Sequence, residues 1–233
     1  MTGIALYAIG DLHLSFGTDK PMDIFGGGWI GHAAKIKSGF QILQPEDVCI
    51  LCGDISWGMQ LEESLEDFIF IDDLPGRKIV LKGNHDYWWN TVSKMLEFFK
   101  SNHIKSIDIL HNNCFFYNDT AICGTRGWIA DDELSNVQNN KIMAREVMRL
   151  RTSLQAAGDV EKKVCFFHYP PRFKNFVSHD IITVMNEYGV TRCIYGHLHG
   201  EGHRLAVRGM VEGIDYEIAS ADFIDFIPQK VIA

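Results

Sequence analysis

The sequence predicts an α/β fold, and the order of its apolar segments is the main reason. Short apolar runs of strand length alternate along the chain with longer segments in which apolar residues recur at helical spacing. Polar residues follow directly after several of the short runs. This alternation is typical of parallel strands that are connected by helices.

The individual elements follow from these runs in order. We expect strands at residues 4–9, 47–51, 78–81, 121–123, 164–167 and 192–195, and helices at residues 61–71, 92–100, 141–156 and 181–188. The tail from residue 203 to 231 differs, because it contains short β-like pieces at 204–207, 216–219 and 223–227. These pieces predict a second sheet with antiparallel pairing.

Composition describes an ordinary globular protein. The chain has 233 residues, of which 46% are hydrophobic and 22% are charged, and we expect one domain over residues 1–233. A net charge of −8 disfavours a broad electrostatic footprint for duplex nucleic acid or an anionic membrane. Neither a signal region nor a run of roughly 18 apolar residues is seen, so we expect a cytoplasmic protein without a membrane span.

The six cysteines lie mostly within apolar runs, which predicts buried, reduced thiols. Cys49 and Cys52 have C-x-x-C spacing, but they lie inside a predicted strand and no second pair accompanies them. A zinc or redox role for this pair is therefore not favoured.

Five polar clusters share one placement, because each follows a short apolar run. They are Asp11-Leu12-His13, Gly53-Asp54, Gly83-Asn84-His85-Asp86, His168, and Gly196-His197-Leu198-His199. Ligands of α/β proteins bind at the carboxyl ends of strands, so the five clusters are expected to converge on one crevice. In Asp-x-His and His-x-His, residues two apart in an extended segment point to the same side and can reach one ion.

In this order the clusters resemble the motif set of the calcineurin-like metallophosphoesterases, which reads D-x-H, G-D, G-N-H-[DE], H and G-H-x-H. All five blocks occur between Asp11 and His199. The resemblance implies two packed mixed β-sheets flanked by helices, in a four-layer α/β/β/α sandwich. It also implies hydrolysis of a phosphomonoester or phosphodiester.

The same resemblance implies a pair of metal ions and their ligands. Asp11, His13 and His199 would bind one ion, Asn84, His168 and His197 the other, and Asp54 would bridge both. Imidazole, carboxylate and amide donors suit manganese, iron, zinc or cobalt, and the choice among these metals stays open. Two ions about 3.5 to 4 Å apart would share a hydroxide that attacks the phosphate ester.

His85 follows the proposed ligand Asn84 directly, and the resemblance makes it the residue that contacts the phosphate or protonates the leaving oxygen. A hydrogen bond that only supports a metal ligand is the alternative role. Asp86 is expected to cap the turn, or else to raise the pKa of His85 as a neighbouring carboxylate.

One departure concerns the branch of the family. Ser/Thr phosphatases continue the second block as G-D-x-x-D-R-G, whereas this chain reads Gly53-Asp54-Ile55-Ser56-Trp57-Gly58 and lacks both that carboxylate and that arginine. Arg126 and Arg172 are the candidates to bind phosphate instead, because a guanidinium forms bidentate bonds to phosphate oxygens. Each of them is equally explained as a surface ion-pair partner.

Other residues have less specific interpretations. The five tryptophans lie near the motifs and are candidates for an aromatic wall, although core packing is the favoured interpretation for most of them. Residues 18–31, which include Trp29, are predicted to form a mobile loop near the mouth of the site or an ordered connection without function. Five histidines are interpreted as surface residues or as residues that support the ligands from behind, namely His32, His103, His111, His179 and His203.

The sequence therefore predicts a metal-dependent phosphoric ester hydrolase that acts on a small phosphate ester. A non-catalytic scaffold of the same fold is one alternative, although such a protein would be expected to have lost ligands or the histidine of G-N-H. A nuclease of the same fold is the other, and the acidic composition together with the absence of a basic stripe counts against it. The oligomeric state is left open.

Overall fold

The computed structural model describes residues 4–232, so the ends of the predicted domain, residues 1–3 and 233, lie outside the described residues. A five-stranded sheet has the order β13-β1-β2-β3-β4. Its strands are β1 (Leu6–Ile9), β2 (Val48–Leu51), β3 (Arg77–Val80), β4 (Ile107–Ile109) and β13 (Gln229–Ile232). The first four are parallel, and β13 pairs with β1 in the antiparallel sense.

A second sheet of six strands has the order β11-β12-β10-β7-β6-β5. Its strands are β5 (Phe115–Tyr117), β6 (Thr120–Thr125), β7 (Lys162–Phe167), β10 (Arg192–Tyr195), β11 (Gly209–Val211) and β12 (Ile214–Ile218). The central four are parallel, whereas β5 and β11 are antiparallel edge strands. A separate short hairpin is formed by β8 (Arg172–Phe173) and β9 (Phe176–Val177).

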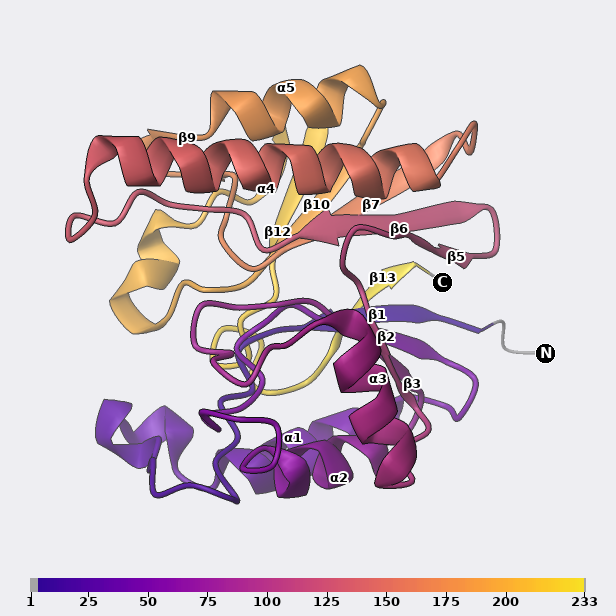
Figure 1. Cartoon of the computed structure of the whole chain (residues 1–233), viewed down its shortest axis with the longest axis vertical. Helices are drawn as coiled ribbons and strands as arrows, with labels where there is room; N and C mark the ends of the chain where they lie inside the picture. Colours follow the sequence, from indigo (N-terminus) through magenta and orange to yellow (C-terminus); the bar gives the residue numbers. More distant parts are fainter. Residues whose placement is uncertain (1–3, 233) are drawn as a thin grey trace.

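Helices cover the outer face of each sheet, as Figure 1 shows. α1 (His32–Gly39), α2 (Leu65–Asp72) and α3 (Val92–Ser101) lie on the five-stranded sheet, and α4 (Asn136–Ala156) and α5 (His179–Glu187) lie on the six-stranded sheet. The molecule is thus a four-layer α/β/β/α sandwich. The predicted fold class, with two mixed sheets flanked by helices, is confirmed.

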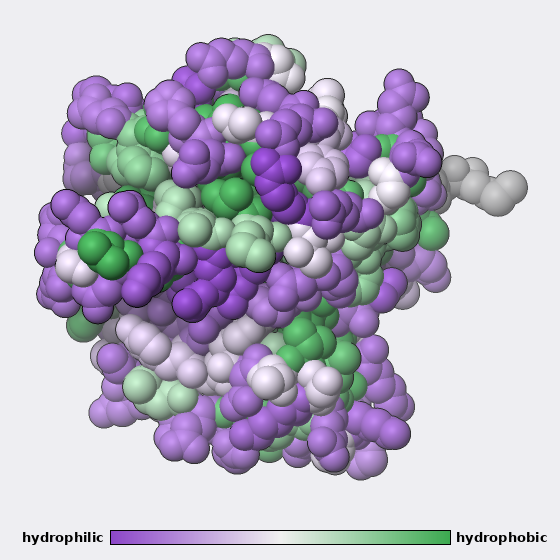
Figure 2. All heavy atoms as spheres, turned by 45° about the horizontal axis from the view of Figure 1, so that its top comes forward, coloured by the Kyte–Doolittle hydropathy of each residue, from purple (hydrophilic) through white to green (hydrophobic). Residues whose placement is uncertain are grey.

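Alternation along the strands explains the layers. In β1, Leu6 and Ala8 point into the apolar cluster between the two sheets, while Tyr7 and Ile9 belong to the cluster under the helices. Both faces of such a strand are buried, which is why its sequence is a continuous apolar run rather than an alternating pattern. On the face seen in Figure 2 the surface is mostly hydrophilic, with hydrophobic residues in separate patches.

All six predicted strands and four predicted helices are present, with changed ends. The helix α4 begins at Asn136 rather than at residue 141, because Ser135 and Gln138 form a capping box before it. The helix α2 begins at Leu65 rather than at residue 61. The helix α1 and the strands β4, β5, β8 and β9 were not predicted, and β11 and β13 lie outside the three pieces expected in the tail.

The tail differs more from its prediction. Residues 200–205 form a 3₁₀ helix rather than a strand. Residues 223–226 form turns in which Asp225 and Phe226 have positive φ, a conformation outside the β region. The β12 and β13 strands join the two main sheets instead of forming a separate antiparallel sheet. Within residues 4–232, no helix has both the length and the apolar character that a membrane crossing requires.

The two chain ends and the polar clusters lie on opposite sides of the sandwich. In Figure 1 the segments around residues 18–31, 126–135 and 196–205 lie together on the left, and both termini lie on the right. The strands β1, β2, β7 and β10 each run toward the first side, so the residues that follow them meet there.

Candidate metal centre

The chain turns sharply where the strands end. Asp11, His13, Asp54 and His197 all have positive φ, between 45° and 72°, which is uncommon outside glycine. Such backbone strain clusters at functional sites and costs on the order of 1 to 3 kcal/mol per residue. Backbone hydrogen bonds hold these turns, with Asp11 N donating to Gly53 O at 2.8 Å and His13 N to Asp54 O at 3.0 Å.

This geometry corrects one step of the sequence argument. Asp11 and His13 were expected to point the same way because they are two apart in an extended segment, but the segment is not extended. They reach the same centre through left-handed turns. Asp11 is fully buried and His13 is 4% exposed, so both are fixed by the surrounding residues.

Two glycines allow neighbouring loops to approach. A Cβ at Gly83 would lie 2.0 Å from Asp54 Oδ1, and a Cβ at Gly53, where φ is +85°, would lie 2.7 Å from Gly83 Cα. No side chain fits at either position. The glycines of the G-D and G-N-H blocks therefore permit the close contact that places Asp54 beside Asn84.

One group of side chains consists of Asp11, His13 and His199. Each offers one ligand atom, and these atoms all lie within 4.8 Å of one another. The Nε2 atom of His199 is 3.5 Å from Asp11 Oδ1, and this buried nitrogen has no hydrogen-bond partner among the described residues. An unpaired buried nitrogen that points at a carboxylate fits a metal ion between them.

A second group consists of Asn84, His168 and His197. The Oδ1 atom of Asn84 lies 2.6 Å from His168 Nε2 and 3.1 Å from His197 Nδ1, and the two nitrogens are 3.2 Å apart. Three donor atoms therefore converge on one point. Neutral imidazole and amide donors in this arrangement suit a first-row divalent metal.

Asp54 lies between the two groups. Its Oδ2 is 3.8 Å from His13 Nε2 and 3.5 Å from His168 Nε2, one histidine from each group. Its other oxygen, Oδ1, accepts a hydrogen bond from the backbone N–H of His85 at 2.8 Å. That bond fixes the carboxylate so that Oδ2 faces both groups.

The protonation states of two histidines fit cation binding directly, whereas at His199 burial is outweighed by Asp11 and Asp222, which raise its pKa to about 10. Burial lowers the pKa of His13 to about 3 and the pKa of His197 to about 4, so both imidazoles are neutral near pH 7, as metal ligands must be. Burial, together with Asp86 and Asp11, raises the pKa of Asp54 well above its usual value. A bound cation would offset this crowding of buried carboxylates.

Two histidines are oriented by acceptors behind them. The Nδ1–H of His168 donates to the carbonyl oxygen of Cys52 at 3.1 Å, and the Nδ1–H of His199 donates to Asp222 Oδ1 at 2.8 Å. Each hydrogen bond leaves Nε2 free to face the centre, which is the arrangement common around metal-binding histidines. Cys52 is thus buried near the centre, and its thiol is not among the converging donor atoms.

Asp222 was missed by the sequence analysis. A signal was present, because it follows the β-like piece at residues 216–219 as the other clusters follow their strands. His203, interpreted from the sequence as a surface or supporting residue, lies with its Nε2 3.3 Å from Asp222 Oδ2. It therefore lies behind His199 rather than at the centre.

Asp86 has a structural position. Its fully buried carboxylate accepts hydrogen bonds from the backbone N–H groups of Asp54, Ile55 and Gly83 and from Trp88 Nε1, at 2.6 to 3.0 Å. These hydrogen bonds connect the Gly53-Asp54 segment to the Gly83–Asp86 turn, which agrees with the capping role expected for Asp86. The His85 ring instead lies 3.4 Å from the Tyr87 hydroxyl and packs near Trp57, with ring centroids 4.5 Å apart.

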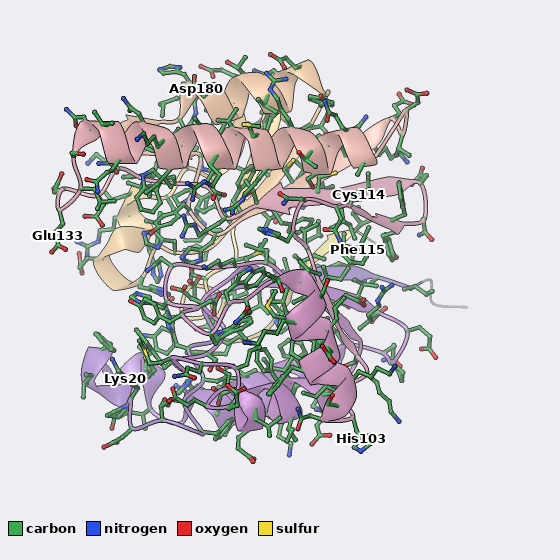
Figure 3. All side chains as sticks on the ribbon, viewed as in Figure 1. Lys20, His103, Cys114, Phe115, Glu133 and Asp180 are labelled. Carbon is green, nitrogen blue, oxygen red and sulfur yellow. The ribbon has the colours of Figure 1, made fainter. Side chains whose placement is uncertain are left out.

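A cavity of about 490 Å³ opens beside His13, His85 and His199. Its other walls are largely apolar, formed by Met22, Phe25, Gly28, Trp29, Trp57, Gly200 and Asp222. Residues 18–31 therefore border the cavity through two short 3₁₀ helices, whereas Trp88 lies in the core. Figure 3 shows Lys20 of this segment at the same end of the molecule as Glu133.

The two candidate arginines lie outside this cavity. Arg172 forms an ion pair with Glu212. The Arg126 guanidinium lies 3.7 Å from Glu146 Oε1 and over the Trp128 ring, while its backbone oxygen accepts from the N–H of His168. The backbone of Arg126 thus contacts the proposed metal ligand His168, whereas its side chain lines a separate depression on the surface.

Comparison with known proteins places the chain in a family. Residues 4–201 match the calcineurin-like phosphoesterase family, which covers most of the sequence and all five polar clusters. The chain belongs to this family. Calcineurin-like phosphoesterases are generally metal-dependent hydrolases of phosphate esters, and the cluster of Asp11, His13, Asp54 and His168 is a possible metal site.

Solved structures support the fold of this calcineurin-like phosphoesterase. The phosphopantetheinyl hydrolase PptH from Mycobacterium tuberculosis is similar with a TM-score of 0.61 and 14% identity, over 97% of this chain and 95% of that one. TT1561 from Thermus thermophilus is similar with a TM-score of 0.57 and 11% identity, over 99% of both chains. No curated protein matches the chain. Identities this low establish the shared fold alone.

Proposed function

We propose that this chain is a two-metal phosphoesterase that hydrolyses a small phosphomonoester or phosphodiester. Asp11, His13 and His199 would hold one ion, Asn84, His168 and His197 the other, and Asp54 would contact both. The observation that carries the proposal is the position of Asp54 Oδ2, which faces one histidine of each group at 3.8 and 3.5 Å. Manganese, iron, zinc and cobalt all suit this donor set.

The two ions, when bound, would supply positive charge for the phosphoryl oxygens and lower the pKa of a water for attack. The residues of the chain have their own tasks. Asp54 would offset the repulsion between two cations, and its orientation is fixed by the N–H of His85. Asp222 and the Cys52 carbonyl orient His199 and His168, so that Nε2 of each ring faces the centre.

His85 is proposed to contact the substrate. It lines the cavity beside His13 and His199, and no carboxylate accepts a hydrogen bond from its ring among the described residues. A ring placed there donates a proton to the leaving oxygen or binds a phosphoryl oxygen. The apolar wall of Met22, Phe25, Trp29 and Trp57 favours an apolar or flat group attached to the phosphate.

Metal analysis combined with an activity panel tests the proposal. The purified chain, loaded separately with Mn²⁺, Fe²⁺, Zn²⁺ or Co²⁺, is assayed on an aryl monoester, an aryl diester, nucleotides and cyclic nucleotides. We expect two ions per chain and hydrolysis of at least one ester class. Asp54→Asn should lose activity, while the exposed control Asp159→Asn should keep it. Absence of hydrolysis with every metal would instead support a scaffold of the same fold.

A further inference from the structure

A second depression, of about 370 Å³, lies beside the centre and differs in character from the apolar cavity. Four cationic side chains line it and the adjoining hollow, namely Lys82, Arg126, Arg145 and Arg149. Glu146 is the one carboxylate among the lining residues of the described chain. The depression is therefore strongly basic in a protein whose net charge is −8.

The single carboxylate is already engaged. Glu146 is fully buried, accepts a hydrogen bond from Thr125 Oγ1 at 2.5 Å, and pairs with Arg149 Nη1 at 2.6 Å. The Arg126 Nη2 atom lies 3.7 Å from the same carboxylate, and Arg126 Nε is buried without a hydrogen-bond partner among residues 4–232. Lys82 and Arg145 form no ion pair within the described part of the chain. The four cationic side chains of the depression are thus only partly neutralised by its single carboxylate.

Crowding of like charge supports this conclusion. Lys82, Arg126 and Arg149 line the same small hollow around the single carboxylate of Glu146. His111 also lines the depression, and its pKa is lowered by burial, Arg149 and Lys82, so its ring adds no charge near neutral pH. Like charges held this close are unfavourable unless an anion lies among them.

The depression adjoins the metal centre on the side of Asn84 and His168. Lys82 lies two positions before Asn84 in the sequence, and the Arg126 carbonyl accepts the backbone N–H of His168. Tyr169 contacts both sides: its ring centroid lies 4.3 Å from that of His197 and 5.6 Å from that of Trp128, over which Arg126 lies. The apolar cavity, by contrast, borders His13 and His199.

We propose that this basic depression binds a second anionic group of the substrate, a phosphate or similar group other than the one that is hydrolysed. The binding of an anion follows from the residues of the depression alone, and its assignment to the substrate rests on the proposed function. The substrate would then extend from the apolar cavity across the centre to the depression. Its class is a phosphate ester that carries a further phosphate.

The anion site is tested first, without metal and without activity. Inorganic phosphate is titrated into the metal-free full chain by calorimetry, so that no bound cation at the centre contributes to its binding. We expect binding that weakens about 10-fold or more in Lys82→Gln and in Arg145→Gln, since each loses a charge-assisted hydrogen bond. Lys100→Gln, which removes the same charge from an exposed position on helix α3, should change the affinity by less than about twofold.

Several results would overturn the site. Absence of phosphate binding would do so, as would equal affinities in the parent, Lys82→Gln and Arg145→Gln proteins. Arg145 is exposed, so its variant tests the site even if Lys82→Gln fails to fold. Equal weakening in Lys100→Gln would assign the effect to overall charge instead. All of these results are independent of whether the chain is an enzyme.

The substrate assignment is tested with non-hydrolysable probes on the metal-loaded chain. Alkane bisphosphonates with spacers of about three to eight carbons are compared with matched monophosphonates, because a linker binds best when its length matches the span. At least one bisphosphonate should bind about 10-fold or more tightly than its monophosphonate, and Arg145→Gln should abolish the difference. If no spacer gives an advantage while inorganic phosphate still binds, a separate anion occupies the depression and the substrate assignment is wrong.

Discussion

Asp222 offers the sharpest test of how the centre is built. Its Oδ1 accepts the Nδ1–H of His199 at 2.8 Å, and its Oδ2 accepts the backbone N–H of Gly200 at 3.1 Å. Asp222→Asn keeps the shape of the side chain and removes its charge. Partners of this kind typically contribute about 10- to 100-fold to metal affinity, or roughly 1.4 to 2.7 kcal/mol.

Protonation of His199 makes the effect of Asp222→Asn on metal affinity depend on pH. Burial opposes protonation of His199, but Asp11 and Asp222 outweigh it and raise the pKa of His199 to about 10. A metal must displace that proton at neutral pH, which weakens binding about tenfold for each pH unit below the pKa. Asp222→Asn lowers the pKa and so relieves part of this competition. The ratio of parent to variant affinity should therefore rise with pH, by up to about tenfold per unit.

The same shift has a consequence for the metal-free fold. Because the pKa of His199 is raised above its unfolded value of about 6.5, its protonation stabilises the fold fully below about pH 6.5. That contribution is lost as the pH rises through about 10. The melting temperature of the metal-free parent should fall more than that of Asp222→Asn between pH 7 and 10.

Chelator competition at several pH values between about 6 and 9 measures the affinities, and calorimetry in two buffers measures proton release. We expect the parent to release more protons than Asp222→Asn on metal binding near pH 7. Asp159→Asn, which changes an exposed aspartate, serves as the control and should follow the parent. An affinity ratio that is flat across this range, or a variant that matches the parent at every pH, would refute the role of Asp222.

Three further predictions concern the centre itself. Asp54→Ala should reduce hydrolysis more than His13→Ala or His199→Ala, because it leaves two cations without a bridge; equal activity of Asp54→Asn and the parent would contradict this. His85→Asn should slow esters of poorly acidic alcohols by about 10²- to 10⁴-fold while sparing nitrophenyl esters at unchanged metal content, and equal slowing of both would favour phosphate binding over proton donation. Gly83→Ala should lower both thermal stability and metal content, because its Cβ would meet Asp54 Oδ1 at 2.0 Å, and normal metal content would show that the loop moves without cost.

The order and placement of the main strands could be predicted from the sequence, because strands that are buried on both faces consist of continuous apolar runs. The runs that became β1, β2, β3, β6, β7 and β10 all have this character. The helix α1 was missed because its segment, His32–Gly39, has little apolar periodicity. Residues 223–227 were misjudged because their apolar side chains pack from a turn, as Phe226 does against Trp29 with ring centroids 5.3 Å apart.

The sequence by itself determined which residues meet at the strand ends, since parallel strands bring their carboxyl ends to one edge and the polar residues follow them directly. It did not determine how those residues are held. Asp222 lies 23 positions from His199 and accepts a hydrogen bond from its ring, and Asp86 fixes a loop 32 positions away. Both contacts exist only after the sheets pack. The same holds for Arg126, whose guanidinium lies beside Glu146 and Lys82, because the direction of a side chain after a strand depends on the helix that packs over it.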